Sequence, residues 1–584
     1  ATSFEAARAA ERLVRIEYAE ETHDAELRAD DPKLFKPEKV NPDTESDTAQ
    51  GDVDAALVAA EFVVDEVYET PAFHNNPMEP HATLAVWEDD RVTLYDSTQG
   101  ATPVQETIAK AFGLPREHVR VISPHVGGGF GSKGTPRPQV VLAALAARVV
   151  SLPVKVAVTR QQMFAMTGYR TPTIQRIRLG AGRDGRLTAV VHDVVEQTST
   201  LEEFAEQTAV VTRMLYASPN RRTTHLLAAL DVPTPSWMRA PGECPGMYAL
   251  ESAIDELAHA CGLDPIELRI RNEPEIDPDT GHPFSSRNLV ACLNEGAERF
   301  GWRERDPTPR SRREGAWLVG MGVAASTYPA RRQPSKARAR RRDGDFVVEL
   351  AAADVGTGAR TVLTQLAAEA LEVPVEMVRV EVGDSTFAPA PLAGGSMGTA
   401  SWGSAVVEAC RRLRESGDEE VEVDTSDEVE RANKESFARH AFGAQFVEVR
   451  VNGETGEVRV PRALGVFAAG RIVNPKTARS QFIGGMTMGI GMALFEESII
   501  DPRFGDYVNH DLATYHVPVC ADIEEIDATW IDEDDSHLNP MGTKGIGEIG
   551  IVGMAAAVAN AVHHATGVRF RKLPIRLDRV ITEI

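Results

Sequence analysis

Cysteine is scarce in this sequence, and the few cysteines are scattered. They are Cys244, Cys261, Cys292, Cys410 and Cys520, and no two of them form a Cys-x-x-Cys element. Zinc ribbons and self-contained iron–sulfur clusters depend on clustered thiolates, so we expect neither. An odd number of unclustered cysteines is typical of a reducing compartment. If the chain carries out redox chemistry, its electron carriers must lie elsewhere.

Long apolar runs and an excess of positive charge are also missing. The sequence has no uninterrupted stretch of about 18 apolar residues, so we expect no membrane-spanning helix. Its 62 basic residues are outnumbered by 87 acidic ones, which gives a formal net charge of −25. Nucleic-acid binding needs positive surface that neutralises phosphates. We therefore expect neither nucleic acid nor a membrane as a partner.

The phosphate-binding P-loop motif and the zinc-protease motif are absent. The sequence contains no Gly-x-x-x-x-Gly-Lys-Ser/Thr and no His-Glu-x-x-His. The glycine-rich run 127–131 could cradle a phosphate, but a dinucleotide fingerprint requires a helix directly after it, and residues 132–136 delay that start. His74, His81 and His125 are expected to be structural rather than metal ligands.

The order of patterns predicts an α+β protein with more than one domain. A chain of 584 residues is too long for one ordinary core. It opens without Met inside a helix-like pattern, so we expect a truncated or internally started chain. A strand at 14–19 and a polar linker with several prolines should follow this helix. Next come a predicted helix at 53–60 and strands near 62–67, 84–87 and 92–95.

A weak internal repeat links two distant regions. A Gly-Ala pair, a helical stretch, an apolar residue before Pro, and Val-Arg-Val follow in the same order over 100–121 and over 358–380. Each copy then runs into a glycine-rich loop, at 127–131 and at 394–398. Two similar halves closing on one extended ligand would explain this order, and chance similarity of a common strand–helix–strand unit explains it equally well.

Two charged segments flank the second copy of the repeat. Residues 331–342 are basic, and we interpret them as a solvated edge beside a strand at 346–350. Residues 415–435 are acidic and polar, which predicts an exposed loop without regular structure. A hairpin should follow, with strands at 446–451 and 457–460.

The most informative stretch is the glycine-rich segment 542–550, which holds Glu548 directly before an apolar run at 551–562. Glycine lets backbone approach a ligand closely, and the amides that open a helix favour an anion. A carboxylate in this position is either a helix cap or a catalytic base.

Six segments together resemble the molybdenum-binding large subunit of the xanthine dehydrogenase and aldehyde oxidase family. The resemblance covers nearly the whole chain, and it is strongest to the bacterial aldehyde-oxidising branch. The segments stand in the family's order: 73–81 (Phe-His-Asn-Asn-Pro-Met-Glu-Pro-His), 97–100 (Ser-Thr-Gln-Gly), 124–131 (Pro-His-Val-Gly-Gly-Gly-Phe-Gly), 238–243 (Met-Arg-Ala-Pro-Gly-Glu), 471–475 (Arg-Ile-Val-Asn-Pro) with Gln481, and 544–548 (Lys-Gly-Ile-Gly-Glu).

The resemblance implies a fold, a cofactor and partners. The fold would be that of a molybdenum hydroxylase large subunit, with two pseudo-related α+β subdomains and the cofactor between them. Residues 1–50 would be a remnant of a hammerhead-like domain and a linker, 51–310 the first cofactor-binding domain and 311–584 the second. The cofactor would be molybdenum–molybdopterin cytosine dinucleotide, and electrons would pass to a [2Fe-2S] subunit and an FAD subunit. The location would be cytoplasmic, or periplasmic through export with a partner subunit.

The resemblance also implies a role for each matching residue. Glu548 would be the general base, which takes a proton as an oxygen attacks the substrate carbon. The pterin dithiolene would hold the metal, in keeping with the lack of a ligand cluster in the sequence. Backbone amides and charge would hold the cofactor. The residues expected to do so are Gln99, Gly100, Phe130, Gly131, Arg239, Gly395, Ser396, Arg471, Ile472, Val473, Asn474, Gln481, Lys544, Gly545, Ile546 and Gly547.

Two departures from the family pattern bear on substrate and cofactor. Purine-oxidising members carry Glu where this chain has Gly134, which argues against xanthine and favours aldehydes or related heterocycles. Thr357 stands where relatives have Gln, and its shorter side chain weakens the expected cofactor contact. A catalytically silent assembly or cofactor-carrier paralogue is the alternative function, and a nucleotide-binding oxidoreductase is disfavoured by the missing fingerprint.

Overall fold

The computed structural model of the chain describes residues 3–434 and 436–584. The first of two large sheets has the strand order β3-β11-β10-β9-β4, in which β10 and β11 are parallel and the other neighbours antiparallel. Its strands are β3 (Thr48–Gln50), β4 (Phe62–Thr70), β9 (Thr173–Ala181), β10 (Leu187–Ser199) and β11 (Arg221–Leu230).

The second large sheet has the order β12-β13-β18-β19-β22, and only its β19–β22 pair is parallel. The long antiparallel pair β13–β18 pairs Trp317 with Asn452 at one end and Pro329 with His440 at the other. The strands are β12 (Arg312–Glu314), β13 (Trp317–Pro329), β18 (His440–Asn452), β19 (Val458–Ala468) and β22 (Ile523–Trp530).

Two helices connect these sheets through one hydrophobic core. Helix α6 (Glu243–Cys261) packs against β4 and β9, helix α13 (Met554–Thr566) packs against β13 and β18, and the two helices contact each other. Gly322 of β13 permits the close approach of α13, because a Cβ there would lie 2.2 Å from the carbonyl oxygen of Ala557. The core includes buried side chains from both halves of the chain.

Two small lobes carry the predicted repeat. The first has the sheet order β7-β6-β5-β8 and the second the order β16-β15-β14-β17. In each lobe the first-named pair is parallel and the other two pairs are antiparallel. This identical topology confirms the repeat. The elements are β5 (Ala82–Glu88), β6 (Arg91–Asp96), α3 (Ala101–Phe112), β7 (Val119–Ile122), α4 (Pro138–Val150), β8 (Val154–Ala157), then β14 (Lys336–Arg342), β15 (Asp345–Leu350), α9 (Ala359–Leu371), β16 (Val378–Val382), α10 (Gly398–Ser416) and β17 (Glu420–Asp424).

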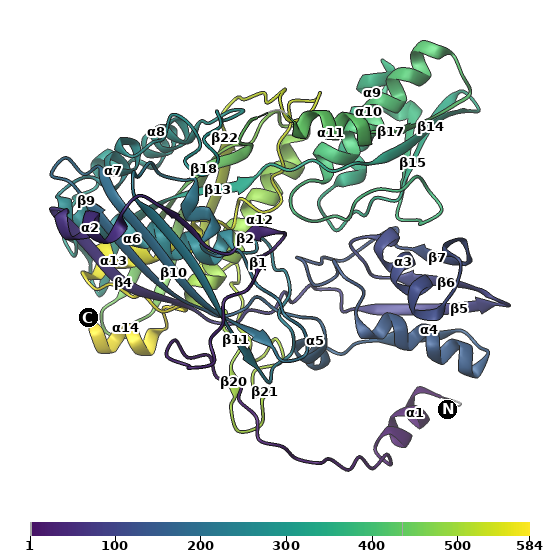
Figure 1. Cartoon of the computed structure of the whole chain (residues 1–584), viewed down its shortest axis with the longest axis horizontal. Helices are drawn as coiled ribbons and strands as arrows, with labels where there is room; N and C mark the ends of the chain where they lie inside the picture. Colours follow the sequence, from purple (N-terminus) through teal and green to yellow (C-terminus); the bar gives the residue numbers. More distant parts are fainter. Residues whose placement is uncertain (1–2, 435) are drawn as a thin grey trace.

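The two lobes lie side by side, apart from the large sheets (Figure 1). Arg120 of β7 forms an ion pair with Asp384, at an Nη2–Oδ2 distance of 2.6 Å. The amide of Ser123 donates to the carbonyl of Gly383 at 2.6 Å. The loops that follow the two repeats therefore meet.

The remaining elements connect or cover these sheets, and they include α12, which packs against α13, β19 and β22. They are α1 (Phe4–Glu11), β1 (Lys39–Val40), β2 (Thr44–Glu45), α2 (Val53–Ala59), α5 (Arg160–Met166), α7 (Pro265–Arg271), α8 (Leu289–Phe300), α11 (Ser426–Asn433), α12 (Pro475–Leu494), β20 (Ile500–Asp501), β21 (Asp506–Tyr507) and α14 (Leu577–Glu583).

Near the N-terminus, one expected strand is wrong. In the part of the chain that the structure describes, residues 14–19 form no strand. They are exposed and have no neighbouring strand to pair with, and Figure 1 shows α1 standing away from the main body. The expected linker is also partly packed, because Val40 is buried and the amide of Phe35 donates to the carbonyl of Leu227.

The two charged segments, 331–342 and 415–435, pair with each other. The expected structures of both segments were wrong. The basic residues form β14, which lies between β15 and β17 rather than at a solvated edge. Most of the acidic segment forms β17 and α11, while Glu415 lies at the end of α10 and Glu435 lies outside the described residues. Arg338 pairs with Glu422 at 2.7 Å and Lys336 with Asp424 at 3.0 Å across the β14–β17 ladder. Opposite charges on facing strands thus order a segment that its composition alone marks as a loop.

Candidate active site

Gln99 joins the loops that follow the two repeats. Its side-chain nitrogen donates to the carbonyl of Ala393 at 2.6 Å, and its side-chain oxygen accepts from the amide of Gly131 at 2.9 Å. The amide of Ala393 donates back to the carbonyl of Gln99 at 2.8 Å. Gly100 opens helix α3 directly after it. The two predicted glycine loops therefore lie at one place between the lobes.

Arg239 is buried and connects three further segments. Its Nε donates to the carbonyl of Gly547 at 2.5 Å, and its Nη2 donates to the carbonyl of Gln481 at 2.8 Å. Its own amide donates to the carbonyl of Phe130 at 3.0 Å. Burial lowers the pKa of this guanidinium to about 10, against the opposing effect of the Glu548 charge. Arg239 therefore remains a cation at neutral pH.

A second buried arginine holds the Arg239 loop in shape. Arg170 donates to the carbonyls of Met238 at 3.1 Å and Ala240 at 3.1 Å, and it pairs with Glu206 at 3.0 Å. A buried ion pair that also donates to several backbone carbonyls fixes geometry more than it adds stability.

Glu548 lies half-buried between the two lobes and the core. Its Oε2 accepts from the hydroxyl of Ser396 at 2.7 Å, and its Oε1 lies 3.4 Å from the amide of Ala240. Helix α13 begins only at Met554, and its N-cap residue Gly553 has no side-chain cap among the described residues. Glu548 is therefore not the cap of this helix, and its role as the catalytic base stays a prediction.

Close backbone contacts and strained residues mark these loops. A Cβ on Gly545 would lie 1.5 Å from the carbonyl oxygen of Ser396, so only glycine fits there. Phe130, Ala240 and Ser396 have φ values of 55°, 57° and 53°, a left-handed conformation that non-glycine residues rarely adopt. Such strain is concentrated at ligand-binding and catalytic sites.

The predicted segment 471–474 lies beside the 542–547 loop. The amide of Arg471 donates to the carbonyl of Gly542 at 2.7 Å, and its side chain pairs with Glu369 at 2.7 Å. Asn474 caps α12 by accepting from the amide of Thr477 at 3.0 Å. Ile472 and Val473 lie between them and are partly buried. This segment therefore supplies a helix N-terminus next to the glycine loop.

The side chain of Lys544 points away from these loops into a buried acidic pair. Its Nζ lies 3.3 Å from Glu533 and 3.6 Å from Asp535, and it also bonds the hydroxyl of Ser286. Ile546 is partly buried, and Gly395 is an open, left-handed glycine with no neighbour closer than 3.9 Å to its Cβ position. Any contact of Lys544 with a ligand would thus come from its backbone.

The sequence analysis gave no role to three charged or polar side chains near the site: Glu243, which belongs to the predicted segment 238–243, Tyr328 and Arg331. Burial raises the pKa of Glu243 to about 8, an effect that Arg331 opposes and Glu548 reinforces. Burial and then the charge of Glu548 raise the pKa of Tyr328. Glu243 opens α6. Tyr328 and Arg331 come from the end of β13, and no local pattern in the sequence could have indicated that they reach this site.

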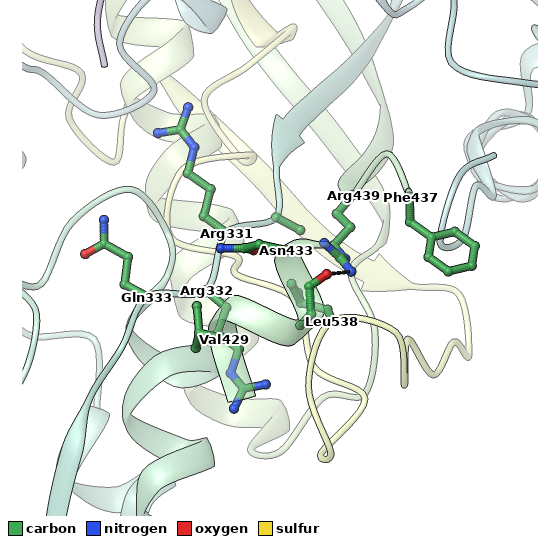
Figure 2. A pocket seen from close by; sticks show the side chains of 10 residues that line it. Arg331, Arg332, Gln333, Val429, Asn433, Phe437, Arg439 and Leu538 are labelled. Atoms are coloured by element: carbon green, nitrogen blue, oxygen red, sulfur yellow. Dashed lines mark hydrogen bonds between the residues drawn. The ribbon is translucent and has the colours of Figure 1, made fainter. Parts of the chain in front are cut away.

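Arg331 reaches the site from the rim of a neighbouring cavity. Arg331 and Arg332 are consecutive but point in opposite directions (Figure 2). Arg332 pairs with Glu428 of α11 at 2.9 Å, whereas Arg331 lies beside the Gly395 loop, 4.0 Å from the Cβ position. The cavity has a volume of about 350 Å³. It is lined by Ala330, Arg331, Arg332, Gln333, Val429, Ala432, Asn433, Phe437, Arg439 and Leu538.

The two residues that depart from the family pattern lie at different edges of the site. Gly134 is buried, and its amide donates to the carbonyl of Gly131 at 3.0 Å. Thr357 precedes Gly358, whose Cβ position would be 2.7 Å from the side chain of Thr477 in α12. Whether Thr357 contacts a cofactor stays a prediction.

The arrangement fits an anionic cofactor that brings its own metal ligands. In the described residues, a group of His, Cys, Asp and Glu side chains that could hold a metal was found only at Asp255, His259 and His563, away from these loops. The loops instead provide closely packed glycine backbone, the N-termini of helices and the guanidinium cations of Arg239 and Arg331. Amides and cations of this kind bind phosphate and pterin oxygens.

This fold and site define a molybdopterin-binding protein, and the chain belongs to that family. The family described as "molybdopterin cofactor-binding domain" matches residues 35–273, and a second family of the same description matches 295–428 and 418–524. The chain is accordingly a molybdopterin-dependent oxidoreductase of the aldehyde oxidoreductase and xanthine dehydrogenase type. The fold expected from the sequence resemblance is confirmed.

Several known proteins are similar to the chain over most of their length. The chain is 42% identical to the aldehyde oxidoreductase molybdenum-binding subunit PaoC of Escherichia coli K12, covering 100% of this chain and 84% of that protein. It is 31% identical to the putative xanthine dehydrogenase molybdenum-binding subunit XdhA of the same organism, covering 92% and 79%. The solved structure of the aldehyde oxidoreductase from Desulfovibrio gigas superposes with a TM-score of 0.87 at 23% identity, covering 100% of this chain and 68% of that one.

A search of the described helices for a membrane span gave a negative result: each is too short or too polar to cross a bilayer.

Proposed function

We propose that this chain oxidises aldehydes to carboxylic acids, with water as the oxygen donor and molybdenum–molybdopterin cytosine dinucleotide as the cofactor. One observation carries the proposal: the half-buried carboxylate of Glu548 is held by Ser396 where the loops of both lobes meet the Arg239 loop. A positioned carboxylate that opens toward a binding site is suited to proton transfer.

The chain's own residues would hold the cofactor along this junction. The glycine loops at 127–131, 394–398 and 545–547 would follow its surface with backbone amides, and Arg239 and Arg471 would balance its negative charge. The start of α12 at Asn474 and the backbone of Gln481 would bound its far end. When bound, the cofactor supplies the two-electron oxidation and an activated water.

Glu548 would take the proton released as the water oxygen bonds to the aldehyde carbon. The overall step converts an aldehyde and water into a carboxylic acid, with two electrons and two protons released. The Ser396 hydroxyl would orient the carboxylate by its 2.7 Å hydrogen bond. Arg239 stabilises negative charge nearby because it stays protonated. General-base catalysis of this kind typically contributes about 10²–10⁴-fold in rate.

Gly134 supports an aldehyde rather than a purine as the substrate. Because Gly134 has no side chain, it provides no group that would hydrogen-bond a purine edge. A site with a side chain that hydrogen-bonds a substrate prefers that substrate over an analogue without the bonding group by about 10⁴-fold. A site without that side chain loses the preference. The stronger match to the relative named as an aldehyde oxidoreductase agrees with this choice.

The electrons would leave through partner subunits. Because the five cysteines are unclustered in the sequence, we expect the chain to carry no iron–sulfur cluster of its own. We infer a [2Fe-2S] subunit and an FAD subunit as partners.

We also propose that residues 51–310 form the first cofactor-binding domain and residues 311–584 the second, with residues 1–50 as a hammerhead remnant and linker.

The deciding experiment compares substrates on the assembled complex. We expect kcat/KM for an aromatic aldehyde to exceed that for xanthine by at least about 10²-fold, since the purine contact is missing. Molybdenum content is measured on the same preparation, and the isolated chain should show no iron–sulfur absorbance. A higher value for xanthine would overturn the aldehyde assignment. Full molybdenum content without turnover of either substrate would favour the catalytically silent paralogue. No observation among the described residues supports that alternative.

A further inference from the structure

A cluster of metal-ligating side chains lies at the far ends of α6 and α13. Asp255 and His259 stand one turn apart on α6, and His563 comes from the last turn of α13. The ligating atoms of the three side chains lie within 4.8 Å of one another. His259 Nε2 is 3.7 Å from Asp255 Oδ2, and the two imidazole rings are 4.9 Å apart.

The imidazoles have nitrogens that the rest of the protein does not use. Among the described residues, neither His259 Nε2 nor His563 Nδ1 has a hydrogen-bond partner, although both atoms are buried. The adjacent His564 is different, because its ring nitrogens bond the amide of Met321 at 3.0 Å and the carbonyl of Asp306 at 2.7 Å. Buried polar atoms usually have partners, so the two unpaired nitrogens call for an explanation.

Charges of both signs surround the three side chains. Both helices end within a turn or two of the cluster, and the C-terminal end of a helix carries partial negative charge. Arg569 and Arg305 face the cluster and oppose a cation, but Arg569 uses Asp255 Oδ2 at 2.7 Å. The same oxygen lies 3.7 Å from His259 Nε2, and the ion pair with Arg569 orients the carboxylate as outer-shell partners orient metal ligands.

The ionisation states also suit metal binding. Burial lowers the pKa of His563 to about 3 and lowers the pKa of His259, so both rings are neutral at pH 7. Burial alone would raise the pKa of Asp255, but Arg569 and Arg269 outweigh it and keep the carboxylate ionised. Metals bind neutral imidazole and ionised carboxylate.

We propose that Asp255, His259 and His563 form a site for a zinc-like divalent transition-metal ion, separate from the molybdopterin site. Two imidazoles and a carboxylate are ligands that Zn²⁺ accepts, with water in the fourth position. Ligands of a tetrahedral zinc ion lie about 3.3 Å apart, so only small side-chain rotations are needed.

The metal would act as a clamp between the two halves of the chain. His259 follows Glu243 by sixteen positions on α6, which places it roughly 24 Å along the helix from the Arg239 loop. The ion is thus too distant to take part in substrate chemistry. It would instead connect the C-terminal ends of α6 and α13. Helix α6 begins shortly after Arg239, and helix α13 begins shortly after Glu548.

The test is zinc binding and thermal stability of the full complex after treatment with a chelator. We expect the wild-type complex to take up about one zinc ion per chain and to gain on the order of 2 °C in Tm at a hundred-fold excess over Kd. Mg²⁺ should give no shift, because it prefers oxygen ligands. The wild-type measurement needs no variant, so it stands even if a substitution impairs folding.

Matched variants locate the ion. H259A and H563A should each lose the zinc uptake and the Tm gain, while H516A, which removes an exposed histidine, should retain both. Molybdenum content and kcat should be unaffected by adding or removing zinc in the wild type. Absence of zinc uptake by the wild type, or uptake by H259A and H563A equal to that of the wild type, would overturn the proposal.

Discussion

Glu243 sits at the first position of α6 with its carboxyl group fully buried. Its Oε2 has no hydrogen-bond partner among the described residues. Burial raises its pKa from 4.5 to about 8, so the folded protein binds the proton more tightly than the unfolded chain. The resulting stabilisation is complete below pH 4.5 and is lost as the pH rises through about 8.

E243Q should remove this pH dependence, because glutamine resembles the protonated acid and does not ionise. We expect the difference in Tm between E243Q and the wild type to grow in favour of E243Q from pH 4.5 to about 8. A difference of one pKa unit corresponds to about 1.4 kcal/mol, so the effect should be readily measured. Thermal unfolding across this range tests it, with the exposed Glu203 changed to Gln as the control. Parallel curves for E243Q and the wild type would show that Glu243 is ionised in the folded protein.

Motifs indicated which single residues lie near one another, and residues that only the fold brings to the site were missed. The sequence resemblance pointed to Glu548, Gln99 and Arg239, and the structure brings these three to one junction. Tyr328 and Arg331 were not foreseen, because they reach the site from the end of β13, far from any glycine loop in the sequence. Their importance depends on tertiary contacts that no local spacing records.

At the level of elements, the loop carrying Gly545 is the tightest junction in the site. A side chain there would collide with the backbone of Ser396, which contacts Glu548. G545A should push the two loops apart, lower the molybdenum content of the complex and destabilise the fold by about 1–3 kcal/mol, as overpacking does. Metal analysis and thermal unfolding on one preparation check this.

G453A is the matched control for G545A. Gly453 lies in the β18–β19 hairpin, and its Cβ position is 3.6 Å from its nearest neighbour, an ordinary contact. It should behave like the wild type in both measurements. Normal molybdenum content in G545A would mean that the 545–547 loop does not bound the cofactor.

Elements were predictable where apolar periodicity decides them. The expected helix at 53–60 and the strands near 62–67, 84–87 and 92–95 are all confirmed, as is the β18–β19 hairpin. The failures have a common physical cause. The acidic segment formed β17 and α11 because a basic strand lies next to it, and residues 14–19 form no strand because they have no neighbouring strand.

For the whole molecule, the repeat predicted two related lobes but not the way the halves are joined. Their large sheets share one core through α6 and α13, so the expected domains are not independent units of packing. That joining is a matter of long-range helix contacts, which neither composition nor motif order encodes. It explains why the site draws residues from both halves and why a metal clamp on these helices would stabilise the entire chain.

The most direct measurement is kcat and bound molybdenum for E548Q on the assembled complex, beside E524Q, which changes an exposed glutamate. Glutamine keeps the size of Glu548 and can accept from Ser396, but it cannot take a proton. We expect kcat to fall about 10²–10⁴-fold with molybdenum content near that of the wild type, because a base is lost while the cofactor loops stay intact. A kcat for E548Q equal to that of E524Q and the wild type would contradict the role of Glu548 as the base.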